Sequence, residues 1–532
     1  MDKKWRERSL LPLAALLAGT VAIAGCSGGA EPEPNPSGEG SKLTQLTYWT
    51  SMAGQAAVSM KSYAEMEAYK EFERLTGVKV GFQHPPQGQD AEQFNLMLTS
   101  GQLPDVIEYH WTSFPGGPEK AVKDGRIIKL NDLIDQHAPN LKKILADHPE
   151  WKKQITTDDG SIVSFPFLRG DKKLQVYKGI ALRKDWLDKL GLAMPTTIEE
   201  WYTVLKAFKE KDPNGNGEAD EIPILITLGE LNGSHAFIGA YGITNGFFQE
   251  GGQVKYGPMD PRFKEFLALM NRWYREGLLD KDYAAIDGKL IDAKITGHQI
   301  GAAIMNTGGG LGKYAGLMQG KHDTFKLAPV PYPTLKKGDK PELGQIDFAF
   351  NGRGAAISTS NKNPVETVKW LDAHYSEQGH MLFNFGKEGV SYNLENGYPK
   401  YTEAITNNPD GLPMQQALAR HNRAGWDGPF VQDLRYLEQY AALPEQQESL
   451  EVWAVPSNEK LMPLVTPTKD ESSKYASIMA DINTYKDEMF HKFVMGAEPL
   501  DNFDAYVQTL KSMGIEEALK IQQAALERYN KR

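Results

Sequence analysis

The order of apolar and polar positions after residue 42 predicts strands and helices that alternate along the chain. The predicted elements are a strand at 46–49, a helix at 63–76, a strand at 78–82, a helix at 91–100 and a strand at 105–109. Gly77 and Gly101 follow the two helices, as is typical of residues that end a helix. This order predicts a parallel sheet covered by helices on both faces, and therefore an α/β fold.

Aromatic residues at the ends of two predicted strands are candidates for a binding site. Ligands of open α/β sheets bind beyond the carboxyl ends of the strands, and Trp49, Tyr109 and Trp111 lie at these ends. The alternative is that the three rings close the strand ends against the hydrophobic core. We treat them as candidate ligand-binding residues.

A second α/β region is predicted to begin near residue 165, with a strand at 179–183. Thr197 and Glu200 have the spacing of a capping box, which predicts that a helix begins directly after Thr197. One face of this helix is apolar and is expected to be buried: Ile198, Trp201, Leu205 and Phe208. The helix leads into an acidic loop.

This loop, residues 212–221, has the spacing of a calcium-binding loop. Oxygen-bearing side chains occupy positions one, three, five, nine and ten, and Gly217 occupies position six, as at the start of an EF-hand loop. Pro223 replaces the usual glutamate at position twelve, so the second EF-hand helix is not expected. The predicted ligands of a structural Ca²⁺ are Asp212, Asn214, Asn216, Asp220, Glu221 and the carbonyl of Glu218. The alternative is a polar turn after a helix.

The first 25 residues have the pattern of an export signal. Basic residues at positions 3, 4, 6 and 8 precede an apolar run at 10–24. Small residues directly before Cys26 resemble the bacterial lipobox, and Cys26 is the only cysteine in the chain. We therefore predict a signal peptide at 1–25, lipid attachment at Cys26 and a disordered tether at 26–42. The alternatives are a signal peptide with an incidental cysteine and an uncleaved membrane anchor.

The charge of the chain argues against a nucleic-acid partner. The 532 residues have a formal net charge of −10, and loss of residues 1–25 would make it −12, because that segment has four basic and two acidic side chains. Binding to a polyanion requires a basic face, and no dense run of Lys and Arg is present. We find no second apolar stretch of ~18 residues, so the lipid is the only predicted contact with the membrane.

Five segments resemble the family 1 extracellular solute-binding lipoproteins of carbohydrate ABC transporters, especially the alginate-oligosaccharide-binding and LplA-type members. They are the lipobox at Cys26, residues 94–107, residues 183–192 with the loop after them, residues 384–392 and residues 521–529. Each segment alone is a weak signal. Their shared order along nearly the whole mature chain carries the resemblance.

The resemblance implies a two-lobed periplasmic-binding-protein-like fold of type II, with hinge crossings and a ligand cleft between the lobes. The expected lobes are 43–165 plus 338–395, and 166–337 plus 396–532. A monomer on the outer face of the cell membrane would capture an oligosaccharide and deliver it to the permease subunits of an ABC importer, with calcium bound at 212–221. By chain position, Trp426 would stack on a sugar ring. Polar candidates in glycine-containing or turn-like loops are Arg169, Asn245, Asn306 and Arg353.

An enzyme is the main rival interpretation. The chain has no His-Glu-x-x-His zinc motif and no Gly-x-Ser-x-Gly motif. Residues 307–313 superficially suggest a phosphate loop, but Tyr314 stands where the Mg²⁺-binding hydroxyl would be, and a loop near the cleft is the preferred interpretation. A glycosidase with paired carboxylates stays open, because such pairs form only in three dimensions. A binding subunit that signals to a membrane sensor also stays open.

Overall fold

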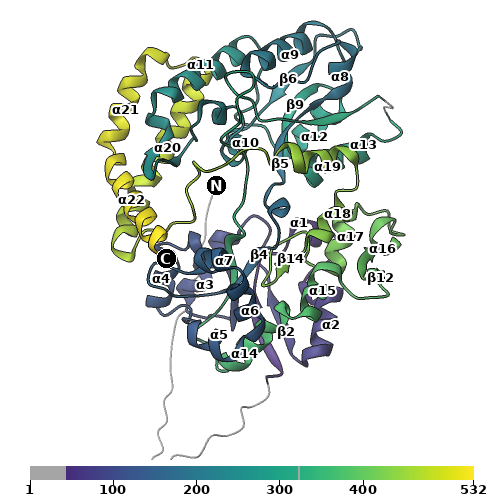
Figure 1. Cartoon of the computed structure of the whole chain (residues 1–532), viewed down its shortest axis with the longest axis vertical. Coiled ribbons are helices and arrows are strands. Elements are labelled where there is room, and N and C mark those ends of the chain that lie inside the picture. The colour runs from purple at the N-terminus through teal and green to yellow at the C-terminus, as the bar shows by residue number, and fades with distance from the viewer. Residues whose placement is uncertain (1–42, 322–323) are drawn as a thin grey trace, which may run out of the picture. The chain divides into compact units, whose positions relative to one another are not determined.

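The computed structural model describes residues 43–321 and 324–532 (Figure 1). The predicted signal peptide, Cys26 and the whole predicted tether lie outside the described residues. Within the described ranges, no helix is long and apolar enough to cross a membrane.

The first sheet in the described part of the chain is six-stranded and mixed. In spatial order its strands are β14 (Val431–Gln432), β4 (Phe165–Arg169), β11 (Phe350–Ile357), β3 (Val106–His110), β1 (Gln45–Trp49) and β2 (Lys79–Gln83). β1 is parallel to both β2 and β3, as the sequence predicts. β11 is antiparallel to β3 and β4, so a late strand enters the sheet from the opposite direction.

The helices around this sheet are α2 (Glu67–Thr76), α3 (Asp90–Ser100), α4 (Gly117–Lys123), α5 (Asn131–His137), α6 (Pro139–Asp147), α7 (Pro149–Ile155), α14 (Pro364–Asp372) and α15 (Glu377–Phe385). Their apolar faces and the strands form a core that includes Tyr48, Phe72, Phe165 and Trp370. The sheet thus has a hydrophobic core of its own.

The second sheet has four strands and a separate core. Its order is β10 (Leu327–Val330), β5 (Lys178–Arg183), β9 (Ile300–Asn306) and β6 (Ile222–Leu225). The elements around it are α8 (Lys184–Lys189), α9 (Ile198–Glu210), α10 (Leu228–Ser234), α11 (Pro261–Arg275), α12 (Gly288–Thr296), α13 (Lys313–Met318) and the hairpin β7 (Phe247–Glu250)–β8 (Gln253–Tyr256). The core includes Trp186, Trp201 and Trp273.

The last three helices also belong to the second sheet's side of the fold. They are α20 (Lys469–Met495), α21 (Phe503–Ser512) and α22 (Ile515–Lys531), drawn in yellow in Figure 1. α20 packs on α11, and α22 packs on α20 and β8. Their apolar residues, including Phe493 and Leu510, join the core of the second sheet.

A smaller group of elements lies against the first sheet. It contains α1 (Gly54–Ala57), α16 (Glu403–Thr406), α17 (Met414–His421), α18 (Leu434–Tyr440) and the hairpin β12 (Tyr392–Glu395)–β13 (Tyr398–Tyr401). α17 contacts α1 and α2, whereas the next helix, α19 (Pro444–Val452), contacts β10 of the second sheet. The chain therefore returns to the second sheet between α18 and α19.

In the described ranges, the chain passes between the two sheets at residues 170–177, 331–349 and 441–443. The predicted α/β class and two-lobed fold are confirmed, since each sheet has its own core. The lobe boundaries stay a prediction. They assign 396–532 to the second lobe, whereas β14 pairs with β4 in the first sheet.

The local elements are close to their predicted positions. The predicted helix at 63–76 is divided into a short 3-10 turn at Tyr63–Glu65 and α2. Thr197 caps α9 by accepting a hydrogen bond from the Glu200 amide. The carboxylate of Glu200 accepts from the amide of Thr196, not from that of Thr197, so the predicted capping box is shifted by one residue on this side.

Candidate functional site

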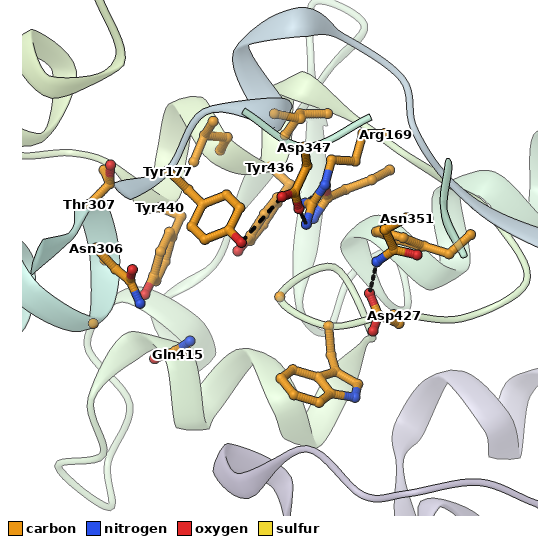
Figure 2. Close-up of a pocket in the computed structure, with 18 of the residues that line it drawn as sticks. Arg169, Tyr177, Asn306, Thr307, Asp347, Asn351, Gln415, Asp427, Tyr436 and Tyr440 are labelled. Atoms are coloured by element: carbon orange, nitrogen blue, oxygen red, sulfur yellow. Dashed lines mark hydrogen bonds and ion pairs between the residues drawn. The ribbon is translucent and has the colours of Figure 1, made fainter. Parts of the chain in front are cut away.

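A cavity of about 580 Å³ lies where residues of both sheets and of the crossings meet (Figure 2). Its volume is within the usual range for small-molecule sites. Its polar and aromatic lining includes Gln55, His110, Arg169, Tyr177, Asn306, Thr307, Asp347, Asn351, Gln415, Trp426, Asp427, Gln432, Tyr436 and Tyr440. Segments that are far apart in the sequence therefore converge on one space.

Arg169, at the end of β4, is the centre of a polar group on one wall. Its Nη2 lies 2.7 Å from Oδ2 of Asp347, and its guanidinium lies 5.3 Å from the ring centroid of Tyr177. The hydroxyl of Tyr177 donates to Oδ1 of Asp347 at 3.5 Å, as Figure 2 shows. Burial, followed by the charge of Asp347, raises the pKa of Tyr177 to about 12, so this hydroxyl stays protonated. Its hydrogen is directed to Asp347, and its oxygen can accept a hydrogen bond from a ligand.

Aromatic rings provide the apolar part of the lining. Tyr436 and Tyr440, one turn apart on α18, are stacked with centroids 5.6 Å apart and an interplanar angle of 16°. Trp426 is 36% exposed, which is a high value for so large an apolar ring. Flat apolar faces beside polar groups suit a ligand that presents both C–H faces and hydroxyls.

Asp427 is held by residues of β11. Its Oδ1 accepts a hydrogen bond from Nδ2 of Asn351 at 3.2 Å, and its Oδ2 lies 3.6 Å from Nε of Arg353. Arg353 also contacts the buried Glu108 at 3.4 Å. Glu108 pairs with the buried Arg423 at 2.8 Å. A buried ionic network therefore lies directly beneath this carboxylate.

Glycines shape the wall that follows β9. A Cβ on Gly308 would lie 2.1 Å from the hydroxyl of Tyr440, so only glycine permits this approach. Oγ1 of Thr307 lies 2.9 Å from Oγ of Ser449, and the carbonyl of Thr307 accepts from Nε2 of Gln446. These bonds hold the segment after Asn306 against α19. It forms a π-helix over Thr307–Gly312, so the predicted loop is wrong, whereas its predicted place near the cleft agrees with its position in the cavity wall.

The structure brings three of the eight predicted ligand-binding residues to the cavity. These are Arg169, Asn306 and Trp426. Arg353 lies behind the wall, where it contacts Asp427. Asn245 lies elsewhere, with its Nδ2 donating to Asn232 and its carbonyl accepting from Nζ of Lys486.

Trp49, Tyr109 and Trp111 pack around Phe94 in a separate apolar cluster. The rings of Phe94 and Tyr109 are stacked 3.6 Å apart, and Nε1 of Trp111 donates to the carbonyl of Gly354. The structure therefore matches the alternative of core packing for these three residues. Side chains alternate along a strand, so the residue between two of them, His110, reaches the cavity instead.

Sequence reasoning did not find Tyr177, Asp347, Asn351, Gln415, Tyr436 and Tyr440 among the lining residues. They come from the crossings, from β11 and from α17 and α18, and none of them belongs to a motif. Asp427 and His110 had a usable signal, because each adjoins a predicted residue.

The loop at 212–221 connects α9 to β6. Asn214 and Asn216 both donate through Nδ2 to Oδ1 of Asp220, and Asp212 accepts from the amide of Gly217. Among the residues that the structure describes, no three His, Cys, Asp or Glu side chains form a metal site by themselves. A cation here would therefore also need the amide and carbonyl oxygens that EF-hand loops supply.

Glu221 gives a test of whether the loop fits a cation. In the described part of the chain, its buried Oε1 has no hydrogen-bond partner. Burial, followed by repulsion from Asp212 and Asp220, raises the pKa of Glu221. Hard oxygen ligands with an unsatisfied carboxylate suit Ca²⁺, so the residues present fit the ion.

Residues 57–381 match the family of bacterial extracellular solute-binding proteins. Over 99% of both chains, the sequence is 29% identical to the fructooligosaccharide ABC transporter substrate-binding protein FusA of Streptococcus pneumoniae serotype 4. It is also 27% identical to lipoprotein LipO of Bacillus subtilis strain 168 over 79% of both chains.

Two solved structures have the same fold. The crystal structure of alginate-binding protein AlgQ2 without calcium ion has a TM-score of 0.75 and 29% identity, and the match covers 92% of this chain and 99% of that one. An EF-hand mutant of FusA from S. pneumoniae in complex with fructo-nystose has a TM-score of 0.75 and 28% identity, covering 91% and 99%.

Proposed function

The chain belongs to the family of bacterial extracellular solute-binding proteins, and from this premise we propose that it binds an oligosaccharide in the cavity and delivers it to an ABC importer. The cavity is the observation that carries the proposal. Its stacked tyrosines, the exposed Trp426 and the surrounding amides and carboxylates offer both surfaces that a sugar needs. FusA, by its name, binds a fructooligosaccharide for an ABC transporter.

We infer that the protein acts at the cell surface, attached through a lipid on Cys26 and extended from the membrane by residues 26–42. The relative LipO is named as a lipoprotein, and the family is extracellular. The partners in this proposal are the permease subunits of the importer, which a monomer would meet once its ligand is bound.

The proposed role includes no catalysis. The relatives that match over most of the chain are named as binding proteins or lipoproteins. Two carboxylates, Asp347 and Asp427, do line the cavity, which keeps the glycosidase alternative testable. A binding protein returns every bound oligosaccharide with its length unchanged after prolonged incubation, whereas shortened products would favour the enzyme.

We also propose that the loop at 212–221 binds a structural Ca²⁺ through Asp212, Asn214, Asn216, Asp220, Glu221 and the carbonyl of Glu218. The unsatisfied Glu221 carboxylate supports this assignment, and the FusA EF-hand mutant indicates that a relative has such a loop. None of the six residues lines the cavity, so the ion would stabilise the fold and not contact the ligand.

Replacement of Trp426 tests the binding site. A panel of oligosaccharides that begins with kestose identifies a ligand by thermal shift, and titration calorimetry then measures its Kd. We expect Trp426→Ala to weaken binding at least about tenfold, which is about 1.4 kcal/mol, because the ring face is lost. Trp426→Phe should retain part of the affinity.

Val455→Ala is the matched control, because Val455 is 59% exposed and does not line the cavity. The control should bind with unchanged Kd. Full affinity in a folded Trp426→Ala protein would contradict the proposed site.

A further inference from the structure

The cavity contains few charged groups, and its cationic groups are already engaged. Apart from tyrosines, the ionisable side chains of its described lining are His110, Arg169, Asp347 and Asp427. Burial lowers the pKa of His110, so this imidazole is neutral at pH 7. One cation and two carboxylates remain, and the lining is net negative.

Arg169 already pairs with one anion, and among the described residues only its Nε has no hydrogen-bond partner, although this atom is buried. Its Nη2 contacts Oδ2 of Asp347 at 2.7 Å, and its side chain is only 15% exposed. Its Nη1 faces Oε1 of Gln432 at 3.4 Å. A ligand carboxylate that took Arg169 would leave Asp347 partly buried without its cation, which is costly.

The cation nearest to Asp427 is also engaged. Arg353 contacts Asp427 at 3.6 Å and Glu108 at 3.4 Å, and it does not line the cavity. Arg423 also pairs with Glu108, because its Nη1 and Nη2 both donate hydrogen bonds to that carboxylate. In this network the charges of Arg353 and Arg423 are balanced by those of Glu108 and Asp427. Nη2 of Arg353 has no hydrogen-bond partner among the described residues, but it is buried and Arg353 does not line the cavity.

A second hollow of about 610 Å³ shares Asn306 and Gly309 with the cavity, so a longer ligand could continue into it. Its charged lining is balanced: Lys178, Lys289 and Lys313 against Glu230, Asp287 and Asp292. Both carboxylate oxygens of Asp292 accept from Nζ of Lys313, at 2.7 and 2.6 Å. This hollow adds no net positive charge.

We propose that the site selects uncharged oligosaccharides and rejects chains that contain uronic acids. This inference rests on the proposed oligosaccharide-binding function. A uronate would lose its hydration on entering the cavity without gaining a free cation, and it would meet Asp347 and Asp427. The hydroxyls of a neutral sugar can instead donate to these two carboxylates, which form strong, charge-assisted hydrogen bonds.

The test compares ligands that differ in charge. The panel holds fructo-, malto-, xylo- and galacto-oligosaccharides of three to five units, together with oligogalacturonates and oligomannuronates of the same lengths. Each acidic series is also supplied as its uncharged methyl ester. We expect the tightest ligand to be neutral, and each ester to bind at least as tightly as its free acid.

The outcomes separate this inference from the proposed function. A free acid that binds tighter than every neutral chain would overturn the charge selection and leave the oligosaccharide-binding function in place. Binding of no member of the panel would overturn both.

The Asp427→Asn variant tests the electrostatic basis. Removing this charge should improve the binding of a free acid relative to the neutral ligand by about threefold or more, through weaker repulsion. Asp410→Asn is the control, since Asp410 pairs with Arg420 at an exposed site outside the cavity. An equal change in affinity for both ligands would overturn the assignment of the selectivity to charge.

Discussion

Arg423 and Glu108 form a bidentate ion pair inside the protein, with both side chains fully buried. Nη1 and Nη2 of Arg423 donate to the two carboxylate oxygens at 2.9 and 2.8 Å. Burial by itself would raise the pKa of Glu108, but the charges of Arg423 and Arg353 and the hydrogen bonds from Arg423 and Tyr48 together lower this pKa to about 2. The carbonyl of Arg423 accepts from the amide of Trp426, so the pair also positions the exposed ring.

Replacement of one partner measures how much the Arg423–Glu108 pair contributes to the free energy of unfolding. We expect Arg423→Met to lower the free energy of unfolding by about 3–5 kcal/mol, because the buried carboxylate of Glu108 loses its bidentate partner and keeps only the longer 3.4 Å contact to Arg353. The double variant Glu108→Gln with Arg423→Met should recover part of the loss. Chemical denaturation at pH 7 measures both.

Arg420→Met is the surface control. Arg420 pairs with Asp410 at an exposed site three residues before Arg423, and such pairs contribute at most about 1 kcal/mol. If Arg423→Met and Arg420→Met lowered the free energy of unfolding equally, burial would not explain the stabilisation by the Arg423–Glu108 pair.

The sign of the pH dependence follows from the pKa of Glu108. This pKa is lower in the folded than in the unfolded chain, where a glutamate titrates near about 4.3. The stabilisation is therefore complete above that pH and is lost as the pH falls toward 2.

Among the elements, the loop between α9 and β6 connects several parts of the second sheet's lobe. Nζ of Lys189 donates to the carbonyl of Pro213, and Nε2 of Gln299, next to β9, donates to Oδ2 of Asp220. The loop thus bridges α8, α9, β6 and β9. A cation that neutralises its carboxylates should stabilise this whole group of elements.

We expect the protein to melt at a lower temperature after its metal is removed with a chelator, and to recover when Ca²⁺ is added back. Calcium at 100 times its Kd would contribute about 2.7 kcal/mol, since it binds only the folded loop. Asp212→Ala should melt at a lower temperature and should not respond to Ca²⁺. Asp410→Ala serves as the control. Identical melting of the metal-free and calcium-loaded protein would contradict the site.

The sequence predicted the start of α9 because the signal for it is local. Thr197 begins α9 as predicted, since a cap depends on residues one turn apart. The aromatic candidates at the strand ends, in contrast, do not line the cavity. Trp49 and Trp111 stand at the predicted edge of the sheet, but the face on which each side chain lies depends on packing partners from other elements, such as Phe94 of α3.

At the scale of the whole described part of the chain, the crossings between the sheets also line the cavity. Tyr177 lies in the first crossing, Asp347 in the second, and Tyr440 directly precedes the third. A ligand held by these residues would contact the segments about which two lobes turn. Contacts to both lobes stabilise a closed form by the difference in affinity between the open and closed states.

We therefore expect saturating ligand to lower the radius of gyration in small-angle X-ray scattering. Residues 43–532 should become more compact as the lobes close on the sugar. Trp426→Ala, at a ligand concentration that saturates only the wild type, should keep the profile of the free protein. An unchanged profile of the wild type at full saturation would contradict closure.

The sequence by itself determined the features that depend on neighbouring residues: the alternating elements, the cap at Thr197, the oxygen spacing at 212–221 and the pattern around Cys26. The resemblance of ordered segments also led to the two-lobed fold. Only the tertiary structure decided which side chains line the cavity. His110, Tyr177, Asp347 and Tyr440 carry no motif, and they meet because three crossings and two sheets bring distant segments together. The commitment of Arg169 to Asp347, which sets the charge of the site, is likewise a contact across 178 residues.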